Sequence, residues 1–547
     1  MRHSRLVSIS LFGLVVSALT VGCGTKSKGT HGGGISGTIT GAPAGVTVTL
    51  GGKAISSTTT DASGNYQFTG LSSGDYTVTP SLSGYVFTPA SYPDVEVDGA
   101  SVTGQDFTAV AVPSTHAISG TVSGAVSAGV TVTLGGDATS STTTDLGGHY
   151  QFSLLPDGTY TVTPRLSGYA FTPASYPAVT VNGADVTGED FISGALQVTG
   201  VTAGNTHTCA IANGGVQCWG DDSYGQLGIN STQGSAVPVS VPGLNGVSAI
   251  GAGQVHTCAA LSGALECWGR NANGQLGDNS TTDRPAPVQV SGLTSGVSAV
   301  AGGGWHTCAI VNGGAQCWGY NGQGQLGDNT DTDRYTPVQV TGLTNGVTAI
   351  ATGGAFSCAI VSGGAWCWGY NAEGQLGNNS TSDFSYVPVQ VYGLASGVTA
   401  IAAGNDFACA AVNGAVKCWG ANDYGSLGNN STSGSNVPVQ VDGLTSGATA
   451  LAASDQGGHV CAIVDGGATC WGENYFAQLG DGSSSADSLV PVQVSGLTSG
   501  ATAITAGVGH TCAVVGNGVQ CWGYNAYGEV GDGSYVQRDV PVEVSGL

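Results

Sequence analysis

Fourteen cysteines in the carboxy-terminal two-thirds of this 547-residue chain fall into seven pairs, each with a spacing of nine. The pairs are Cys209 with Cys218, Cys258 with Cys267, Cys308 with Cys317, Cys358 with Cys367, Cys409 with Cys418, Cys461 with Cys470, and Cys512 with Cys521. Such thiols can form disulfides, bind zinc or stay unpaired. Successive pairs lie 49 to 52 residues apart, which brings no four ligands together for a tetrahedral zinc site. The spacing therefore favours disulfides.

Histidine, which can bind a metal or transfer a proton, stands two residues before the first cysteine in five of the seven units. These residues are His207, His256, His306, His459 and His510. Phe356 and Phe407 take the equivalent position in the other two units. Because phenylalanine replaces histidine here, we expect a packing role rather than a ligand or catalytic one.

Acids and amides gather in loops such as 278–283 and 328–333. Oxygen-rich loops can bind calcium, but these lack the glycine and terminal glutamate of the EF-hand, so we expect solvated turns. No Ser/His/Asp order, paired-carboxylate motif or cofactor fingerprint is evident. The sequence therefore predicts a protein that is not an enzyme and needs no cofactor or metal.

The turn chemistry places the cysteines of each pair opposite each other. The midpoints of the pairs are dipeptides such as Asn213-Gly214, Asn312-Gly313 and Asp465-Gly466, which tolerate the positive φ angles of a type I′ hairpin turn. Counting back from the turn puts the cysteines at a non-hydrogen-bonded site, where α-carbons lie about 4.5 Å apart. Each bridge closes a ten-residue loop and should contribute about 2.5 kcal/mol.

Each unit reads as four strands, exemplified by the patterns VTAIAAG, HTCAIV, GVQCWG and VPVQV. Seven such units predict a closed, seven-bladed β-propeller over residues 195–547, with one disulfide inside each blade.

The run from His306 to Gly327 resembles the regulator of chromosome condensation (RCC1) repeat family, whose fold is a seven-bladed propeller. All seven units carry a Trp-Gly pair, and most add Gly-Gln-Leu-Gly. The departures are Ser426 for glutamine, Ala477 for glycine and Glu529-Val530 for Gln-Leu.

Two copies of a smaller module precede the repeats. TTTDASGNYQF at 58–68 returns as TTTDLGGHYQF at 142–152, and period-two runs alternate with Gly, Asp and Ser turns, as in antiparallel sandwiches. The pattern resembles carboxypeptidase regulatory-like domains, expected at 34–110 and 116–194. Lys53 aligns with Asp137 and no asparagine stands in 102–107, so we expect no Lys–Asn isopeptide bond. The predicted fold class is all-β.

The first residues show the pattern of an exported protein. A basic start, an apolar core over 6–19 and small residues before Cys23 indicate a signal peptide at 1–22. The ending Leu19-Thr20-Val21-Gly22-Cys23 resembles a bacterial lipobox, although Thr20 departs from the usual leucine, and an ordinary signal peptide is the alternative. The resemblance implies lipidation of Cys23 and anchoring of the exported chain to a membrane of the cell envelope. Residues 23–33 read as a flexible tether.

Charge excludes one class of partner. The formal net charge is −23 with 11 lysines and arginines, so nucleic acid is not an expected partner. The RCC1 family's best-known activity is nucleotide exchange on a small GTPase, but the export signal and acidic charge argue against that role here.

We expect a binding module that presents a protein or glycan site on the propeller, with the sandwiches as a stalk. The loops before the proline-containing last strand differ most among the units, and their aromatic and arginine side chains are candidate anchors. They are Arg284, Arg334, Tyr335, Phe384, Tyr386, Tyr475, Phe476 and Tyr535. The alternatives are a structural or adhesive envelope component and a polysaccharide hydrolase.

Overall fold

The computed structural model describes residues 32–112, 114–166, 168–484 and 486–547. The predicted signal peptide and Cys23 lie outside these residues. The described residues form forty-five strands and no helix, so they contain no helix able to cross a membrane. The predicted all-β class is confirmed.

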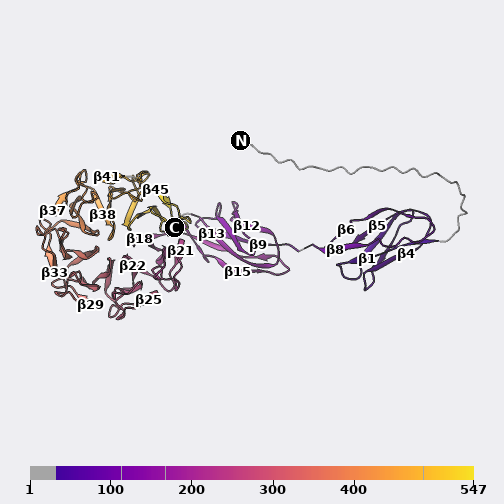
Figure 1. The fold of residues 1–547 in the computed structure, drawn as a ribbon, viewed down its shortest axis with the longest axis horizontal. Helices are drawn as coiled ribbons and strands as arrows, with labels where there is room; N and C mark the ends of the chain where they lie inside the picture. Colours follow the sequence, from indigo (N-terminus) through magenta and orange to yellow (C-terminus); the bar gives the residue numbers. More distant parts are fainter. Residues whose placement is uncertain (1–31, 113, 167, 485) are drawn as a thin grey trace, which may run out of the picture. The chain divides into compact units, whose positions relative to one another are not determined.

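The first domain is a sandwich of two four-stranded sheets, ordered β4-β1-β8-β6 and β3-β2-β5-β7 (Figure 1). Its strands are β1 (Gly33–Thr40), β2 (Thr47–Gly52), β3 (Ser56–Thr59), β4 (Asn65–Leu71), β5 (Gly74–Ser81), β6 (Tyr85–Thr88), β7 (Tyr92–Val97) and β8 (Phe107–Ala111). Strands β1 and β8 pair in parallel, and the other pairs are antiparallel.

Period-two alternation builds the core of this domain. In β2, Val48 and Leu50 are buried while their neighbours Thr47 and Thr49 are exposed. Leu50 lies opposite Val78 of β5, and both join one core cluster between the sheets. The threonine-rich runs thus form strands because every second side chain is apolar.

The second domain repeats the architecture, with sheets β12-β9-β17-β14 and β11-β10-β13-β15 and β16 added beside β9. Its strands are β9 (His116–Gly124), β10 (Thr131–Gly136), β11 (Ser140–Thr143), β12 (His149–Leu155), β13 (Gly158–Arg165), β14 (Tyr169–Thr172), β15 (Tyr176–Val181), β16 (Val186–Thr187) and β17 (Phe191–Ala195).

Seven four-stranded antiparallel sheets follow, each built from one continuous stretch of chain. The innermost strands are β18 (Val198–Ala203), β22 (Val247–Ala252), β26 (Val297–Gly302), β30 (Val347–Thr352), β34 (Val398–Ala403), β38 (Ala448–Ala453) and β42 (Ala501–Ala506). The second strands are β19 (His207–Ala212), β23 (His256–Leu261), β27 (His306–Val311), β31 (Phe356–Val361), β35 (Phe407–Val412), β39 (His459–Val464) and β43 (His510–Val515).

The third strands are β20 (Gly215–Gly220), β24 (Ala264–Gly269), β28 (Gly314–Gly319), β32 (Gly364–Tyr370), β36 (Ala415–Gly420), β40 (Gly467–Gly472) and β44 (Gly518–Gly523). The outer strands are β21 (Ser235–Ser240), β25 (Arg284–Gln289), β29 (Arg334–Gln339), β33 (Phe384–Gln390), β37 (Ser435–Gln440), β41 (Ser488–Gln493) and β45 (Arg538–Glu543). The predicted four strands per unit and seven blades are confirmed.

All seven predicted disulfides are present, one in each blade. The bonds join Cys209 to Cys218, Cys258 to Cys267, Cys308 to Cys317, Cys358 to Cys367, Cys409 to Cys418, Cys461 to Cys470, and Cys512 to Cys521. The two cysteines of each bond lie directly opposite each other on the second and third strands, with α-carbons 4.0–4.1 Å apart. The predicted register is therefore correct.

The hairpin turns between these strands follow the prediction in six blades. In blades one to six both turn residues have positive φ, as a type I′ turn requires. Blade seven differs, because Gly516 has positive φ but Asn517 does not.

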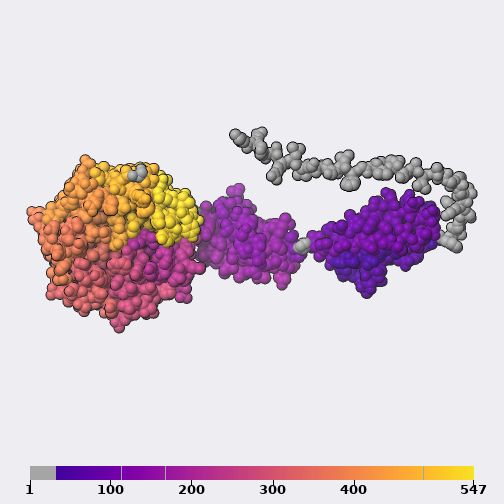
Figure 2. Space-filling model, in the orientation of Figure 1, coloured from indigo at the N-terminus to yellow at the C-terminus, as the bar shows by residue number. Residues whose placement is uncertain are grey.

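The ring closes between its first and last blades. The inner strands of neighbouring blades contact one another in order, and β18 also contacts β42. In the space-filling view, the yellow carboxy-terminal blade lies against the magenta first blade (Figure 2). Among the described strands none is exchanged across this seam, so side chains and loops hold it shut.

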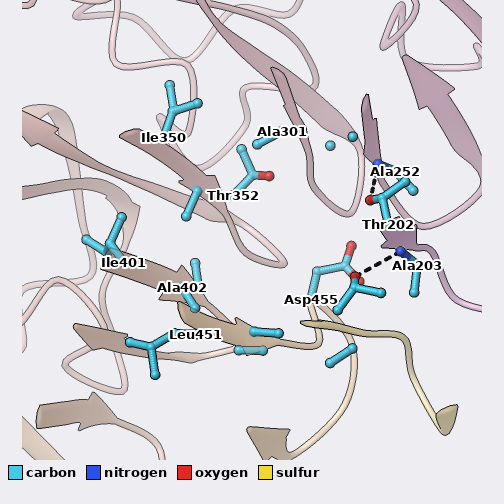
Figure 3. A pocket seen from close by; sticks show the side chains of 18 of the residues that line it. Thr202, Ala203, Ala252, Ala301, Ile350, Thr352, Ile401, Ala402, Leu451 and Asp455 are labelled. Atoms are coloured by element: carbon cyan, nitrogen blue, oxygen red, sulfur yellow. Dashed lines mark hydrogen bonds between the residues drawn. The ribbon is translucent and has the colours of Figure 1, made fainter. Parts of the chain in front are cut away.

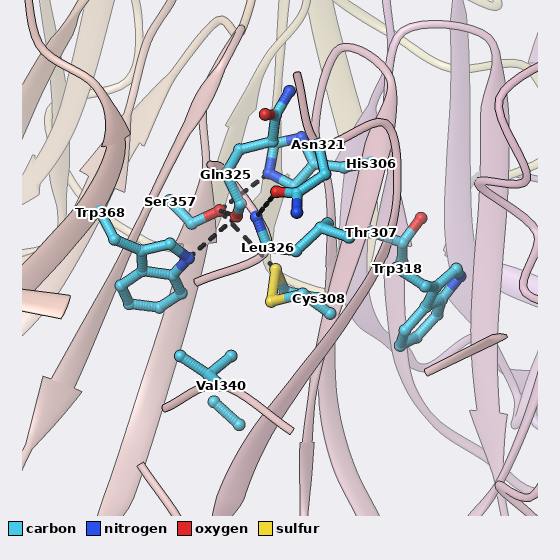
Figure 4. Close-up of a disulfide and its surroundings, with 12 residues drawn as sticks. His306, Thr307, Cys308, Trp318, Asn321, Gln325, Leu326, Val340, Ser357 and Trp368 are labelled. Atoms are coloured by element: carbon cyan, nitrogen blue, oxygen red, sulfur yellow. Dashed lines mark hydrogen bonds between the residues drawn. A yellow bond between two sulfur atoms is a disulfide. The ribbon is translucent and has the colours of Figure 1, made fainter. Parts of the chain in front are cut away.

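Each blade inserts a tryptophan against the blade before it. The Trp368 indole is fully buried and donates from Nε1 to the carbonyl of Gln325 at 2.9 Å (Figure 4). Trp368 shares a core cluster with Leu326 and with the Cys308–Cys317 bridge of blade three. The leucine of Gly-Gln-Leu-Gly therefore fills the core between blades.

Candidate binding face of the propeller

The five histidines connect the blades. His306 lies 2.8 Å through Nε2 from the hydroxyl of Ser357 in the next blade, and that hydroxyl donates to the carbonyl of Gln325 at 3.0 Å (Figure 4). The histidine must therefore be the donor to the serine. Burial, together with the neighbouring His256, lowers the pKa of His306 to about 3, so the imidazole stays neutral. The other four histidines bond to threonines in the same way.

The loops after the first and third strands of every blade emerge at the same end of the sheets. We call this surface the loop face; in blade three it comprises residues 303–305 and 320–333. The opposite face carries the hairpin turns after the second strands and the links between blades. The departures from the repeat at Ser426, Ala477 and Glu529-Val530 lie in loops of this face.

Two predicted anchors are engaged within their own loops. Arg284 pairs with Asp278 and Arg334 with Asp328, each at 2.8 Å. The Asn321 amide donates to Asp328 and to two loop carbonyls. The acid-rich loops are thus held by internal hydrogen bonds and an ion pair, rather than being simply solvated as the sequence predicted.

Other predicted anchors lie at the outer rim. The rings of Tyr335 and Tyr386 pack over Gly274 and Gly324 of the preceding blade, where a β-carbon would collide with them. The Phe384 ring packs at a tilt against Tyr386, with ring centroids 5.0 Å apart, and is partly exposed. Tyr535 is exposed. Among the described residues, no ring contact joins these side chains to the remaining pair, Tyr475 and Phe476.

Tyr475 and Phe476 belong to a four-ring cluster on blades six and seven. Ring centroids are 4.9 Å apart for Tyr475–Phe476, 4.7 Å for Phe476–Tyr524 and 6.3 Å for Tyr524–Tyr527. Tyr475 is 73% exposed, and Tyr527 is also exposed. Sequence reasoning missed Tyr524 and Tyr527. Their position in the repeat could have identified them, since both stand in the segment after Trp-Gly that carries Tyr475 and Phe476 in blade six.

A second aromatic group surrounds a cation on blades one to three. The Arg270 guanidinium lies 4.8 Å from the ring centroid of Tyr224 and 5.0 Å from that of Trp305. Three blades contribute one side chain each, so sequence proximity gave no hint of the stack. Cation–π contacts of this kind hold the arginine in place.

The inner strands surround an axial cavity of about 240 Å³ (Figure 3). Apolar residues such as Ile350 and Ile401 line it, together with Thr202 and Thr352. Asp455 also faces this cavity from the loop after β38, which is two residues longer than its counterpart in blade five. Burial raises the pKa of Asp455 to about 7. The described residues hold no group of three or more His, Cys, Asp or Glu side chains suited to a metal.

Comparison with known families follows the domain order. The family model described as regulator of chromosome condensation (RCC1) repeat matches residues 213–260, 262–310, 312–360, 362–411, 413–463 and 465–514, and a second RCC1 repeat model matches 198–226. The carboxypeptidase regulatory-like domain model matches 34–110 and 117–192.

Curated relatives match parts of the chain. Serine-aspartate repeat-containing protein F of Staphylococcus epidermidis is 34% identical over 194 residues, which cover 28% of this chain and 11% of that protein. The ultraviolet-B receptor UVR8 of Arabidopsis thaliana is 32% identical over 132 residues, which cover 24% of this chain and 30% of that protein. The chain therefore spans less than a third of the length of either relative.

Two solved structures share the fold. Human WBSCR16 aligns with a TM-score of 0.53 and 22% identity, covering 60% of this chain and 94% of that one. Yeast RCC1 (Prp20), solved with Kap60, aligns with a TM-score of 0.52 and 20% identity, covering 64% of this chain and 84% of that one. At these identities the likeness concerns the fold alone.

Proposed function

The chain belongs to the RCC1 repeat family, and on that premise we propose that it is a non-enzymatic binding protein whose propeller recognises a protein partner on its loop face. The two carboxypeptidase regulatory-like domains act as a stalk in this proposal. Cys23 would carry the lipid that anchors the exported chain to the cell envelope.

The four-ring cluster of Tyr475, Phe476, Tyr524 and Tyr527 is the observation that carries the proposal. Aromatic side chains supply large contact areas at little entropic loss and are enriched at the centres of protein interfaces. Tyr475 projects from the cluster with most of its surface in solvent. An exposed, contiguous aromatic group on a rigid ring is the arrangement that a partner can cover.

The disulfides support export. Seven bridges persist only in an oxidising compartment, which agrees with the signal-like first residues. The net charge of −23 disfavours anionic partners. We therefore propose an extracellular protein partner that is not itself strongly acidic.

Capture from surface extracts tests the proposal. The mature full chain should retain a saturable protein partner, and the double variant Tyr475→Ala plus Tyr527→Ala should retain at least tenfold less. Tyr392→Ala is the matched control, because Tyr392 is 60% exposed but follows the outer strand of blade four on the opposite face. Equal capture by the double variant would contradict the proposed site. Binding on a glycan array without protein capture would favour a glycan ligand instead.

A further inference from the structure

A pocket opens on the loop face between blades five and six. Its volume is about 240 Å³, smaller than the roughly 300–1,000 Å³ typical of sites for drug-sized ligands. The residues that line it include Asp406, Asp423, Tyr424, Ser426, Gly458 and Glu473. Its size suits one side chain or a very small molecule.

The pocket exists because blade five departs from the repeat. Ser426 stands where five other blades carry glutamine, and its hydroxyl donates to the carbonyl of Gly458 at 2.7 Å. The glutamine of blade four, Gln375, instead extends its amide to Asp406 of the next blade at 3.1 Å. The shorter serine leaves the corresponding space open between blades five and six.

Two further small residues stand where the seam between blades two and three has large ones. Ala421 takes the position of Arg270, and Gly458 takes that of Trp305. In blades one to three the arginine fills this region between two aromatic rings. At blades five and six the chain provides no cation of its own, since none of the lining residues is lysine or arginine.

The pocket instead carries negative charge that no lining cation balances, although the Glu473 carboxylate accepts the N–H of Gly458 at 3.0 Å. Asp406, Asp423 and Glu473 all line it. Burial raises the pKa of Asp406, and the nearby Glu373 carboxylate raises it further, although amides of Gln375 and Asn405 donate to it. A cation seated here would meet three carboxyl groups and the ring of Tyr424, which is partly exposed.

We propose that this pocket receives an arginine side chain of the protein partner, placed where Arg270 lies at the seam between blades two and three. The proposal rests on the proposed function, because it names the chemistry of that partner. A guanidinium fits best, since its planar fork can donate to two carboxylates while its face stacks on tyrosine.

The test uses the mature full chain and N-acetyl-arginine amide as probe, followed by saturation-transfer NMR at millimolar concentration. We expect saturable binding that is at least tenfold weaker for N-acetyl-citrulline amide, which has nearly the same shape but no charge. N-acetyl-lysine amide should bind more weakly than the arginine probe. Equal binding of arginine and citrulline probes would overturn the proposal.

Filling the pocket provides the variant test. Ser426→Gln installs the side chain found in five other blades and should weaken binding of the arginine probe at least tenfold. Ser446→Gln, in the exposed link on the opposite face of blade five, is the matched control and should bind like the parent. Asp423→Asn, which removes one charge, gives a second variant should Ser426→Gln fail to fold, and it should weaken the probe severalfold. Unchanged binding in a folded Ser426→Gln protein would overturn the proposal.

Probe binding tests the pocket and partner capture tests the proposed function, so the two measurements distinguish failure of one proposal from failure of the other. The double variant Tyr475→Ala plus Tyr527→Ala should lose the partner and keep the arginine probe, because these rings do not line the pocket. Partner capture that survives in Ser426→Gln would refute the pocket's role and leave the proposed function intact. Probe binding by a chain that captures no protein partner would support the pocket as an arginine site and contradict the proposed function.

Discussion

Asp222 and Glu529 place carboxyl groups at positions where other blades carry amides. Asp222 stands where the remaining six blades have asparagine, and Glu529 where most have glutamine. Both side chains are fully buried, and each keeps one oxygen without a hydrogen-bond partner. Burial, with a contribution from the Asp221 carboxylate, raises the pKa of Asp222 to about 6 and that of Glu529 to about 7. Glu529 lies at the closing seam, where its carbonyl accepts from Thr208 and Trp219 of blade one. Asp222 instead accepts the N–H of Leu227, which belongs to the core shared by blades one and two.

Glu529→Gln should stabilise the protein at pH 8 and have little effect at pH 4. The unfolded state releases this proton near pH 4.5 and the folded state near pH 7, so the contribution of Glu529 to stability falls as pH rises between these values. The expected gain at pH 8 is on the order of 2 kcal/mol. Urea unfolding at both pH values measures it, and an equal effect at pH 4 and pH 8 would contradict the assignment.

Asp222→Asn should also stabilise the protein at pH 7, by about 1–2 kcal/mol. The Asn321 amide of blade three donates to the carbonyls of Thr330 and Thr332, which holds the loop after the third strand. An ionised Asp222 has no proton to donate and accepts only the N–H of Leu227. Thermal unfolding and amide exchange in loop 223–234 provide the measurement. Asp221→Asn is the neighbouring control, and a gain of the same size there would point to relief of general charge repulsion.

At the scale of the blade, much of the structure follows from local sequence. The cysteine spacing and the turn dipeptides predict the same register, and the structure confirms that register in every blade, although blade seven lacks the predicted type I′ turn. The binding surface was less predictable. Arg284 and Arg334 looked like free anchors because their ion pairs with aspartates six residues earlier form only when the loop folds back. The Arg270 stack and the blade-five pocket each combine residues from different blades, at least about 30 positions apart in sequence. A local sequence pattern cannot show such contacts.

Removing one disulfide should destabilise the propeller modestly. The double variant Cys308→Ser plus Cys317→Ser is expected to lose up to about 2.5 kcal/mol, and less to the extent that the Asn312-Gly313 turn forms locally in the unfolded chain. Urea unfolding of the parent and variant measures the loss. In dithiothreitol the parent loses its own bridges, so a difference that persists unchanged there would show that the serines act through packing rather than through the missing bond.

At the scale of the whole ring, the seam between blades seven and one depends on a small set of contacts. Thr208 bonds to His510 and to the carbonyl of Glu529, the same carbonyl receives the indole N–H of Trp219, and Ala203 donates to Thr505. Side chains of both blades share one core cluster. The sequence predicted closure from the repeat number, but it did not identify which residues hold the seam.

Deleting residues 501–547 should therefore impair the entire propeller rather than one blade. The deletion uncovers Trp219, Val198 and Leu196, which belong to the cluster shared with blade seven. We expect loss of the cooperative calorimetric transition of the propeller, while the two sandwich domains still unfold separately. Retention of a sharp propeller transition would show that six blades suffice.

The contiguity of each blade also bears on how such a ring can change. Every sheet is completed before the chain passes to the next one. Recombination of the gene between equivalent points of two repeats would therefore add or remove one whole blade, with its own disulfide, tryptophan and hairpin turn. Each remaining blade would keep all four of its strands. For the same reason, joining the present ends of the ring and reopening it between any two other blades should yield a circular permutant in which all seven sheets are intact.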